Sequence, residues 1–226
     1  MINIAKLNQI ISLARKCNDC AMLHFTNFSK DMINLKIDNS PVTIADLAVN
    51  HIAINGLQKI FPDIKIISEE SNKSQKQFKN NKLFWLVDPI DGTKEYINST
   101  PNFTVNFALI ENRSPIFGLI SQPFTGTTWY SFRGKAWKIE KHEILSNAKQ
   151  IECSKINFDK LNIVSSFNHR STELENWISI AKPKSDKDIG SSIKFCYMAE
   201  GKVDLYPRTS PTMEWDIAAG HSIIKA

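Results

Sequence analysis

The chain has 226 residues, of which 42% are hydrophobic and 23% are charged, and its formal net charge is +5. This length suits one large domain or two small, closely packed ones, and no apolar run approaches the ~18 residues that span a membrane. The charge is too small and too dispersed to indicate nucleic-acid binding, and the N-terminus lacks the pattern of a signal peptide. We therefore expect a globular cytoplasmic protein; a peripheral contact with the inner face of the membrane stays open, as do monomer and homodimer.

Helices are predicted in the first quarter of the chain. Apolar residues recur with helical spacing over residues 3–28, and a second helix is expected from Thr43 to about Pro62, which terminates it. Cys17 and Cys20 form a C-x-x-C inside the first helical pattern. Because the other two cysteines and the histidines offer no matching pair of ligands, we expect free thiols rather than a zinc or redox site.

The remainder alternates strands and helices without a regular β-α-β rhythm, which favours a layered mixed α/β architecture over a doubly wound sheet. Strands are predicted at 64–67, 84–87, 103–110, 116–121, 127–132 and 161–165, helices at 171–181, 191–200 and 216–225, and a polar connection at 140–160. The candidate acidic residues of the chain are far apart in the sequence. They meet only if residues 1–130 and 190–226 pack as one unit.

A pair of carboxylates ends an apolar run in the middle of the chain. Asp88 and Asp91 bracket a proline directly after Phe-Trp-Leu-Val, and we expect a turn that points both carboxylates to one side and exposes the carbonyl of Ile90. Oxygen ligands without a nearby His or Cys favour Mg²⁺ or Mn²⁺ over zinc. Taken alone, the same residues also suit a surface turn, but their position after a core-like strand favours a metal site.

Other acidic residues follow apolar segments in the same way. Glu69 and Glu70 follow the run 64–67, and Asp216 begins the last apolar helix. Each also has a simpler interpretation, because Glu69 suits an exposed loop and Asp216 suits a helix cap. Asp46, three residues after Thr43, fits a capping box.

Gly92 and Thr93 follow the carboxylate pair and are predicted to open a short helix. Their free backbone N–H groups suit a phosphate. Two divalent cations beside that phosphate would lower the pKa of an attacking water and neutralise the leaving oxygen. A threonine hydroxyl with an acidic partner can orient the water. The combination predicts a metal-dependent phosphomonoesterase.

Two segments carry a resemblance to a known family. The run Asp88-Pro-Ile-Asp-Gly-Thr93 and the run Trp215-Asp-Ile-Ala-Ala-Gly220 resemble the paired signatures of the magnesium-dependent inositol monophosphatase superfamily, over nearly the whole chain. The resemblance implies an α/β/α/β/α sandwich and two or more Mg²⁺ ions, with Mn²⁺ as the alternative. It implies these metal ligands: the side chains of Glu69, Asp88, Asp91 and Asp216 and the carbonyl of Ile90.

The resemblance also implies the other roles. Asp46, Thr93 and Glu69 would be catalytic, with Asp46 the acidic partner of Thr93, and Gly92 and Thr93 would hold the scissile phosphate. Residues 1–226 would form a single catalytic unit, in which 1–135 carry most metal ligands and 160–226 carry the last metal aspartate and the nucleotide-side residues.

Further segments look like the 3′(2′),5′-bisphosphate nucleotidase branch, notably 93–97, 103–110 and 190–208. That branch converts adenosine 3′,5′-bisphosphate to AMP and is linked to sulfate assimilation. Matching substrate-binding positions are His169, Ser191, Lys194 and Arg208. Inositol phosphatases carry a carboxylate where this chain has Thr209, so an inositol or sugar phosphatase is the second hypothesis. A catalytically inactive nucleotide-binding protein is the third.

Overall fold

The computed structural model describes residues 2–29, 32–36, 41–71, 82–166 and 170–226. Its helices are α1 (Ile4–Thr26), α2 (Ile44–Ile60), α3 (Thr93–Ile97), α4 (Thr172–Ala181), α5 (Ile193–Ala199) and α6 (Glu214–Lys225). Its strands are β1 (Ile33–Leu35), β2 (Pro41–Thr43), β3 (Lys65–Ser68), β4 (Leu83–Asp91), β5 (Thr104–Glu111), β6 (Ser114–Ser121), β7 (Thr128–Phe132), β8 (Lys135–Ile139), β9 (Lys149–Ile151), β10 (Asn162–Ser165) and β11 (Ser185–Asp188).

The large sheet has seven strands in the order β3-β4-β5-β6-β7-β8-β9. β3 runs parallel to β4, and every later neighbour is antiparallel, so β4 to β9 follow one another as successive hairpins and connections. β10 and β11 form a separate parallel pair, and β1 and β2 a small antiparallel one. The parallel pairing of β3 with β4 in the large sheet brings the carboxyl ends of these two strands to the same edge.

Side-chain alternation gives this sheet two apolar faces. In β4, Trp85 and Val87 join the core under α1 and α2, whereas Leu86 joins the core against α5 and α6. In β5, Phe107 faces the first core and Ala108 the second. Since successive strand residues point to opposite faces, a strand with apolar residues at nearly every position must be covered on both sides.

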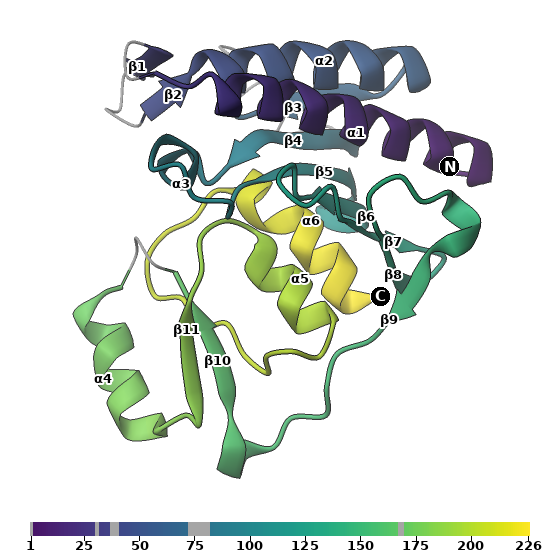
Figure 1. Ribbon diagram of the computed structural model, residues 1–226. Coiled ribbons are helices and arrows are strands. Elements are labelled where there is room, and N and C mark those ends of the chain that lie inside the picture. Colours follow the sequence, from purple (N-terminus) through teal and green to yellow (C-terminus); the bar gives the residue numbers. More distant parts are fainter. Residues whose placement is uncertain (1, 30–31, 37–40, 72–81, 167–169) are drawn as a thin grey trace.

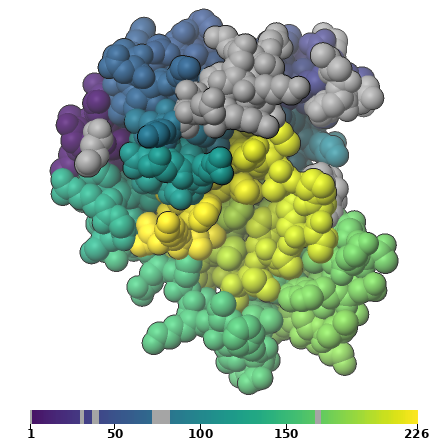
Figure 2. All heavy atoms as spheres, turned by 180° about the vertical axis from the view of Figure 1, so that it is seen from behind, coloured from purple at the N-terminus to yellow at the C-terminus, as the bar shows by residue number. Residues whose placement is uncertain are grey.

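The covered sheet is the centre of a five-layer molecule. Figure 1 shows α1 and α2 on one face of the large sheet and α5 and α6 on the other, followed by β10 and β11 and then by α4 as the outermost layer. This is the α/β/α/β/α order expected from the sequence, and that prediction is confirmed. Seen from behind in Figure 2, the yellow C-terminal segment lies between the blue and teal N-terminal half and the green layer.

The close fit of α6 on the sheet has a local cause. α6 contacts β4, β5 and β6, and a Cβ built on Gly118 of β6 would lie 2.2 Å from the carbonyl oxygen of Ala219. Only glycine allows the helix backbone to approach that strand so closely. The approach positions the first turn of α6, which carries Asp216, against the end of β4. That residues 1–226 act as one catalytic unit stays a prediction.

Most predicted elements are present, with bounds that differ by a few residues. Two predictions are wrong. The strand expected at 84–87 continues through Asp91, because the residues after it still pair with β5. The connection expected at 140–160 contains β9 and two short 3₁₀ turns. The sequence also missed β1, β2, β8 and β11, which are short or polar and so lack a clear apolar alternation.

All four cysteines are free thiols, and Cys17 is fully buried on the inner face of α1. Burial raises the pKa of the Cys17 thiol, so it behaves as an apolar core group. Among the described residues, none of the helices is long and apolar enough to cross a membrane.

Candidate metal and phosphate site

A β-bulge brings the two aspartates of β4 to one face of the sheet. Asp88 pairs with Asn106 and Asp91 pairs with Thr104, so β4 has one extra residue between them. Residues three apart in a regular strand point to opposite faces, but one extra residue restores them to the same face. Ile90 accordingly returns to the core under α1 and α2, which leaves both carboxylates on the side of α6. Both carboxylates therefore lie on one side as predicted, although a β-bulge and not a turn places them there.

Three carboxylates from different elements meet at this edge. Glu69 follows β3, Asp88 lies in β4 and Asp216 lies in the first turn of α6, and one oxygen of each lies within 4.8 Å of the others. The parallel pairing places Glu69 beside Asp88, and the Glu69 N–H donates to the carbonyl of Val87 at 3.1 Å. The distant acidic residues therefore converge as predicted from the sequence.

The cluster has the properties of a cation site. Asp88 is 1% exposed, and its Oδ1 is buried without a hydrogen-bond partner among the described atoms. Burial first, and then the charges of Glu69, Asp91 and Asp216, raise the pKa of Asp88 well above its ordinary value. An unpaired buried carboxylate oxygen among like charges is unfavourable unless a cation neutralises it. Oxygen ligands of this kind fit Mg²⁺ or Mn²⁺.

Asp91 lies next to this cluster and has a fixed orientation. Its Oδ2 accepts a hydrogen bond from Asn106 Nδ2 at 3.3 Å, and Asn106 in turn accepts one from Ser192 Oγ at 2.8 Å. Burial, and next the charge of Asp216, raise the pKa of Asp91 to about 7. Asn106 was not identified from the sequence, because an asparagine inside a strand has no distinguishing pattern.

Asp46 has both of the roles that the sequence left open. Its Oδ2 accepts hydrogen bonds from the backbone N–H and the hydroxyl of Thr43, at 2.7 and 2.6 Å, which completes the capping box of α2. Its Oδ1 accepts a hydrogen bond from Thr93 Oγ1 at 3.3 Å. Burial raises the pKa of Asp46. One carboxylate thus fixes the start of a helix and contacts the threonine of the β4–α3 segment.

Asp216 likewise combines a cap with the acidic cluster. Its Oδ2 accepts from Thr212 Oγ1 at 2.7 Å and from the N–H of Met213 at 3.1 Å, both at the start of α6. These bonds hold the carboxylate in place, and one of its oxygens lies in the cluster with Glu69 and Asp88. The helix cap is therefore compatible with a place in the acidic cluster.

Gly92 and Thr93 connect the aspartates to α3. Gly92 has φ +93°, and a Cβ at this position would lie 3.0 Å from the carbonyl oxygen of Asn102 and 3.1 Å from Cβ of Ser191. Glycine is therefore required for both conformation and space. Thr93 Oγ1 also lies 3.3 Å from the carbonyl oxygen of Ile90. That carbonyl has two lone pairs, so the threonine contact leaves it able to bind a cation.

A cavity of about 510 Å³ opens above these groups. Glu69, Asp91 and Asp216 border it on one side, together with Gly92 and Thr93. Ser191, Lys194 and Arg208 also border it, and thus bring cationic and hydroxyl groups into the same space. A single cavity therefore combines carboxylates that suit cations with side chains that suit an anion.

Lys36 is a cavity residue that the sequence analysis missed. Its Nζ forms ion pairs of 2.7 Å with both Glu69 and Glu70. A lysine in a short polar segment carries no pattern that distinguishes it from surface lysines. Both glutamates are paired with Lys36, but of the two only Glu69 also belongs to the acidic cluster among the described residues.

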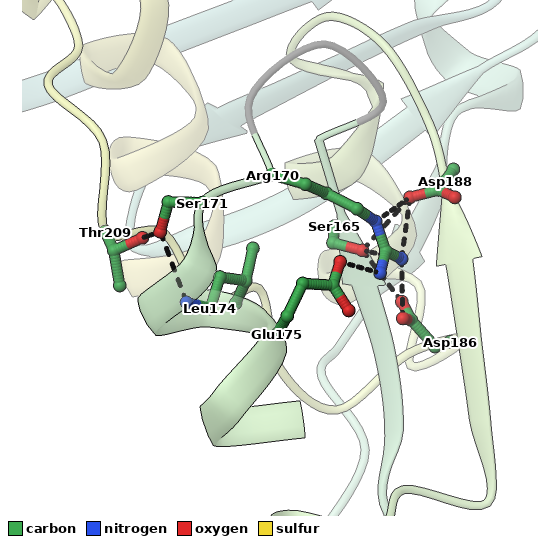
Figure 3. Close-up of polar contacts among 8 residues, drawn as sticks. All are labelled: Ser165, Arg170, Ser171, Leu174, Glu175, Asp186, Asp188 and Thr209. Atoms are coloured by element: carbon green, nitrogen blue, oxygen red, sulfur yellow. Dashed lines mark hydrogen bonds and ion pairs between the residues drawn. The ribbon is translucent and has the colours of Figure 1, made fainter. Parts of the chain in front are cut away.

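An ion-pair network supports the outer layer beside the cavity. Figure 3 shows the Arg170 guanidinium between β10, β11 and α4, where it contacts Asp186 at 2.6 Å, Asp188 at 2.8 Å and Glu175 at 2.8 Å. It also donates to Ser165 Oγ at 2.8 Å. These bonds connect the end of β10, next to the cavity residue Ser166, with β11 and α4.

A second contact in Figure 3 connects α4 with the segment that carries Arg208. Ser171, the N-cap of α4, and Thr209 share a hydrogen bond of 2.8 Å between their hydroxyls. Thr209 is thus directed to α4. His169, expected among the substrate-binding residues, lies outside the described residues.

Comparison with known proteins supports the same interpretation. A family model described as the inositol monophosphatase family matches residues 6–226. The chain belongs to this family. Curated relatives named 3′(2′),5′-bisphosphate nucleotidase CysQ include one from Escherichia coli K12, 38% identical over 97% of this chain and 87% of the relative. Another, from Buchnera aphidicola of Acyrthosiphon pisum, is 40% identical over 97% of this chain and 81% of the relative.

Solved structures of the inositol monophosphatase family share the fold. CysQ from Bacteroides thetaiotaomicron has a TM-score of 0.76 at 30% identity and covers 96% of this chain and 85% of its own. An inositol monophosphatase from Thermotoga maritima has a TM-score of 0.78 at 24% identity, covering 96% and 81%. The similarity to the Thermotoga maritima protein shows a shared fold and nothing more.

The family's expected site residues lie together wherever they are described. These are Asp46, Glu69, Asp88, Ile90, Asp91, Gly92, Thr93, Ser191, Lys194, Arg208 and Asp216, all at the cavity or directly beneath it. Their individual roles in binding and catalysis stay predictions.

Proposed function

We propose that this protein is a metal-dependent phosphomonoesterase, a 3′(2′),5′-bisphosphate nucleotidase that converts adenosine 3′,5′-bisphosphate to AMP and phosphate. The similarity to CysQ relatives over 97% of the chain supports this activity. The observation that carries it is the cavity that joins an acidic cluster to cationic side chains, Lys194 and Arg208 among them. Its expected setting is sulfate assimilation, as the resemblance implies.

We assign the acidic cluster to two or more Mg²⁺ ions, with Mn²⁺ as the alternative. Glu69, Asp88, Asp91 and Asp216, with the carbonyl of Ile90, would hold them. Bound divalent cations supply a water that ionises near neutral pH and neutralise charge on the leaving oxygen. The unpaired Oδ1 of Asp88 favours such an occupant.

The protein's own residues would orient the reaction. The hydroxyl of Thr93, in contact with Asp46, would hold the attacking water, with Glu69 as a second oxygen acceptor. The backbone N–H groups of Gly92 and Thr93 would bind the scissile phosphate. Lys194, Arg208 and Ser191 would bind the second phosphate and the nucleoside, since cations suit a phosphate that does not react.

A polyol phosphatase is less favoured. At the position where inositol phosphatases carry a carboxylate for sugar hydroxyls, this chain has Thr209, whose hydroxyl is bound to Ser171. The neighbouring Arg208 borders the cavity and adds positive charge. A second phosphate is therefore a better match than a neutral polyol. We expect a small-molecule substrate and no nucleic acid; a cytoplasmic location stays a prediction.

A substrate panel tests the proposal. Phosphate release is measured from adenosine 3′,5′-bisphosphate and from inositol 1-phosphate, each with Mg²⁺, with Mn²⁺ and with EDTA. We expect metal-dependent release and a preference for the bisphosphate. Turnover of inositol 1-phosphate at least about tenfold faster would replace the proposal with the polyol phosphatase, and no release from any substrate would favour the inactive nucleotide-binding protein.

A further inference from the structure

The cationic side of the cavity brings two positive side chains close together. Lys194 is 3% exposed, and its Nζ donates hydrogen bonds to the carbonyls of Ile189 and Ser191. Burial lowers the pKa of Lys194 to about 8; the charges of Asp91 and Glu95 oppose this shift, whereas the charge of Arg208 acts in the same direction. The two cations repel each other, and neighbouring groups hold both beside the cavity.

Tyr206 contacts both cations. Lys194 Nζ lies 5.1 Å from the centroid of its ring, and Arg208 Nη1 donates to its hydroxyl at 3.0 Å. The ring face attracts a cation through its quadrupole, and the phenol oxygen is an acceptor. The ring itself is fixed by an edge-on contact with Phe195, with centroids 5.5 Å apart and planes at 82°.

The rest of Arg208 is held by its own loop. Its Nε donates to the carbonyl of Ser210 at 3.2 Å, and Nη2 to that of Pro211 at 2.8 Å. With the bond to Tyr206, these contacts use three of the five N–H groups of a guanidinium. The arrangement fixes the direction of the guanidinium and retains N–H groups for an anion.

We propose that Tyr206 is a specificity-determining positioning residue, whose ring and hydroxyl hold Lys194 and Arg208 together as one binding site for the non-reacting phosphate of the substrate. This inference rests on the proposed function. A phosphate monoester carries nearly two negative charges at neutral pH, and two cations held in advance bind it without first having to be ordered. The side-chain contacts of Tyr206 are with Lys194, Arg208 and Phe195, so we expect its effect on substrate selection and not on the chemical step.

Two variants separate the contributions of Tyr206. Tyr206→Phe keeps the ring over Lys194 and removes the acceptor for Arg208, whereas Tyr206→Leu removes both. Each is assayed with adenosine 3′,5′-bisphosphate and with adenosine 3′-monophosphate, which has the scissile phosphate but not the second one. Melting temperatures verify that the variants fold.

We expect Tyr206→Phe to raise the KM for the bisphosphate about three- to tenfold, as for loss of one ordinary hydrogen bond. Tyr206→Leu should raise it by about 10- to 100-fold, since the cation–π contact is lost as well. The kcat and the KM for the monophosphate should stay within about twofold, because the scissile phosphate contacts other residues.

Tyr197→Leu is the matched control. Tyr197 lies on α5 and has Lys202 over its ring at 5.0 Å, but it is not one of the described residues that border the cavity. This variant should leave both KM values unchanged. Equal losses on the two nucleotides in the Tyr206 variants would overturn the inference, because they would indicate stacking on the base or general damage. A normal bisphosphate KM in Tyr206→Leu would overturn it as well.

The wild-type enzyme distinguishes the two proposals. If it releases phosphate from neither nucleotide, the proposed function fails before Tyr206 is tested. If it prefers the bisphosphate and the Tyr206 variants keep that preference, the proposed function stands and the role of Tyr206 is refuted.

Discussion

Thr93 at the start of α3 donates a hydrogen bond to Asp46 in the first turn of α2, with 3.3 Å between Oγ1 and Oδ1. The two residues are 47 positions apart in the sequence, and the second oxygen of Asp46 is bound to Thr43. The hydroxyl of Thr93 is therefore directed by a buried carboxylate that cannot turn away. That orientation suits a hydroxyl that holds a reacting water.

Thr93→Val tests this relationship, because valine keeps the shape of threonine and removes the hydroxyl. We expect kcat to fall by at least about 100-fold, as for loss of a proton-transfer contact, with an unchanged melting temperature. Thr100→Val is the control, since Thr100 Oγ1 donates to the carbonyl of Glu95 in the same segment at 3.1 Å. A similar kcat in the two variants would contradict the role of Thr93.

Asp91→Asn tests the metal assignment. The amide keeps the size of the carboxylate and removes its charge, so we expect kcat to fall by at least about 1,000-fold through weaker metal binding. Raising the Mg²⁺ concentration should restore part of the activity. Asp204→Asn is the control, because Asp204 is bound to Ser154 and Asn162 away from the acidic cluster. Near-normal turnover in Asp91→Asn would exclude Asp91 as a ligand.

We expect Lys194 to make substrate binding depend on pH. Burial lowers its pKa to about 8, so the side chain is charged below that pH and loses its proton as the pH rises through it. We expect the KM for the bisphosphate to rise above pH 8, while the KM for adenosine 3′-monophosphate changes little. Lys194→Arg should remove this rise, since arginine keeps its proton. Below pH 8, Lys194→Ala should weaken binding of the bisphosphate by roughly 1–3 kcal/mol, and the difference from the wild type should decrease above that pH.

The same two nucleotides give the result that would contradict this role. If Lys194→Ala raises the KM for adenosine 3′-monophosphate as much as the KM for the bisphosphate, then Lys194 does not bind the second phosphate.

Metal removal should make stability depend on pH. The pKa of Asp91 is raised to about 7 and that of Asp88 is raised as well, so the folded protein without metal binds protons more tightly than the unfolded chain. Its free energy of unfolding therefore falls as the pH rises through about 7. In EDTA we expect the melting temperature to decrease from pH 6 to pH 8. Mg²⁺ at 100 times its Kd should stabilise the protein by about 2.7 kcal/mol.

Asp88→Asn is the comparison for that experiment. It removes one of the repelling charges, so the decrease in melting temperature from pH 6 to pH 8 in EDTA should become smaller. A wild-type melting temperature that is the same at pH 6 and pH 8 and does not respond to Mg²⁺ would contradict a cation site at this cluster.

Gly118→Ala should destabilise the protein by about 1–3 kcal/mol. The new Cβ would meet the backbone carbonyl of Ala219 at 2.2 Å, and a backbone atom cannot move aside as a flexible side chain can. Because α6 carries Asp216, a displacement of this helix should also reduce the increase in melting temperature that Mg²⁺ produces. Ser114→Ala at the exposed start of the same strand is the control and should change neither quantity.

The long periodic elements and the chemistry of the site could be predicted from the sequence. Helical spacing gave α1 and α2, and Pro62 marked the end of α2, because these signals are local. The run from Asp88 to Thr93 indicated cations and phosphate, since carboxylates and free N–H groups determine which ligands suit them. Short strands such as β8, β9 and β11 were missed, because pairing with neighbours and not their own residues makes them strands.

Only the tertiary structure decided which groups meet. The bulge in β4 places Asp88 and Asp91 on one face, the parallel pairing of β3 and β4 brings Glu69 beside them, and the packing of α6 adds Asp216. Lys36 and Tyr206 enter the site by the same packing and carry no local signal. The residue types determined the chemistry that this protein is suited to. The distances that turn separate side chains into one site depend on contacts between segments far apart in the chain, and a local pattern does not contain that information.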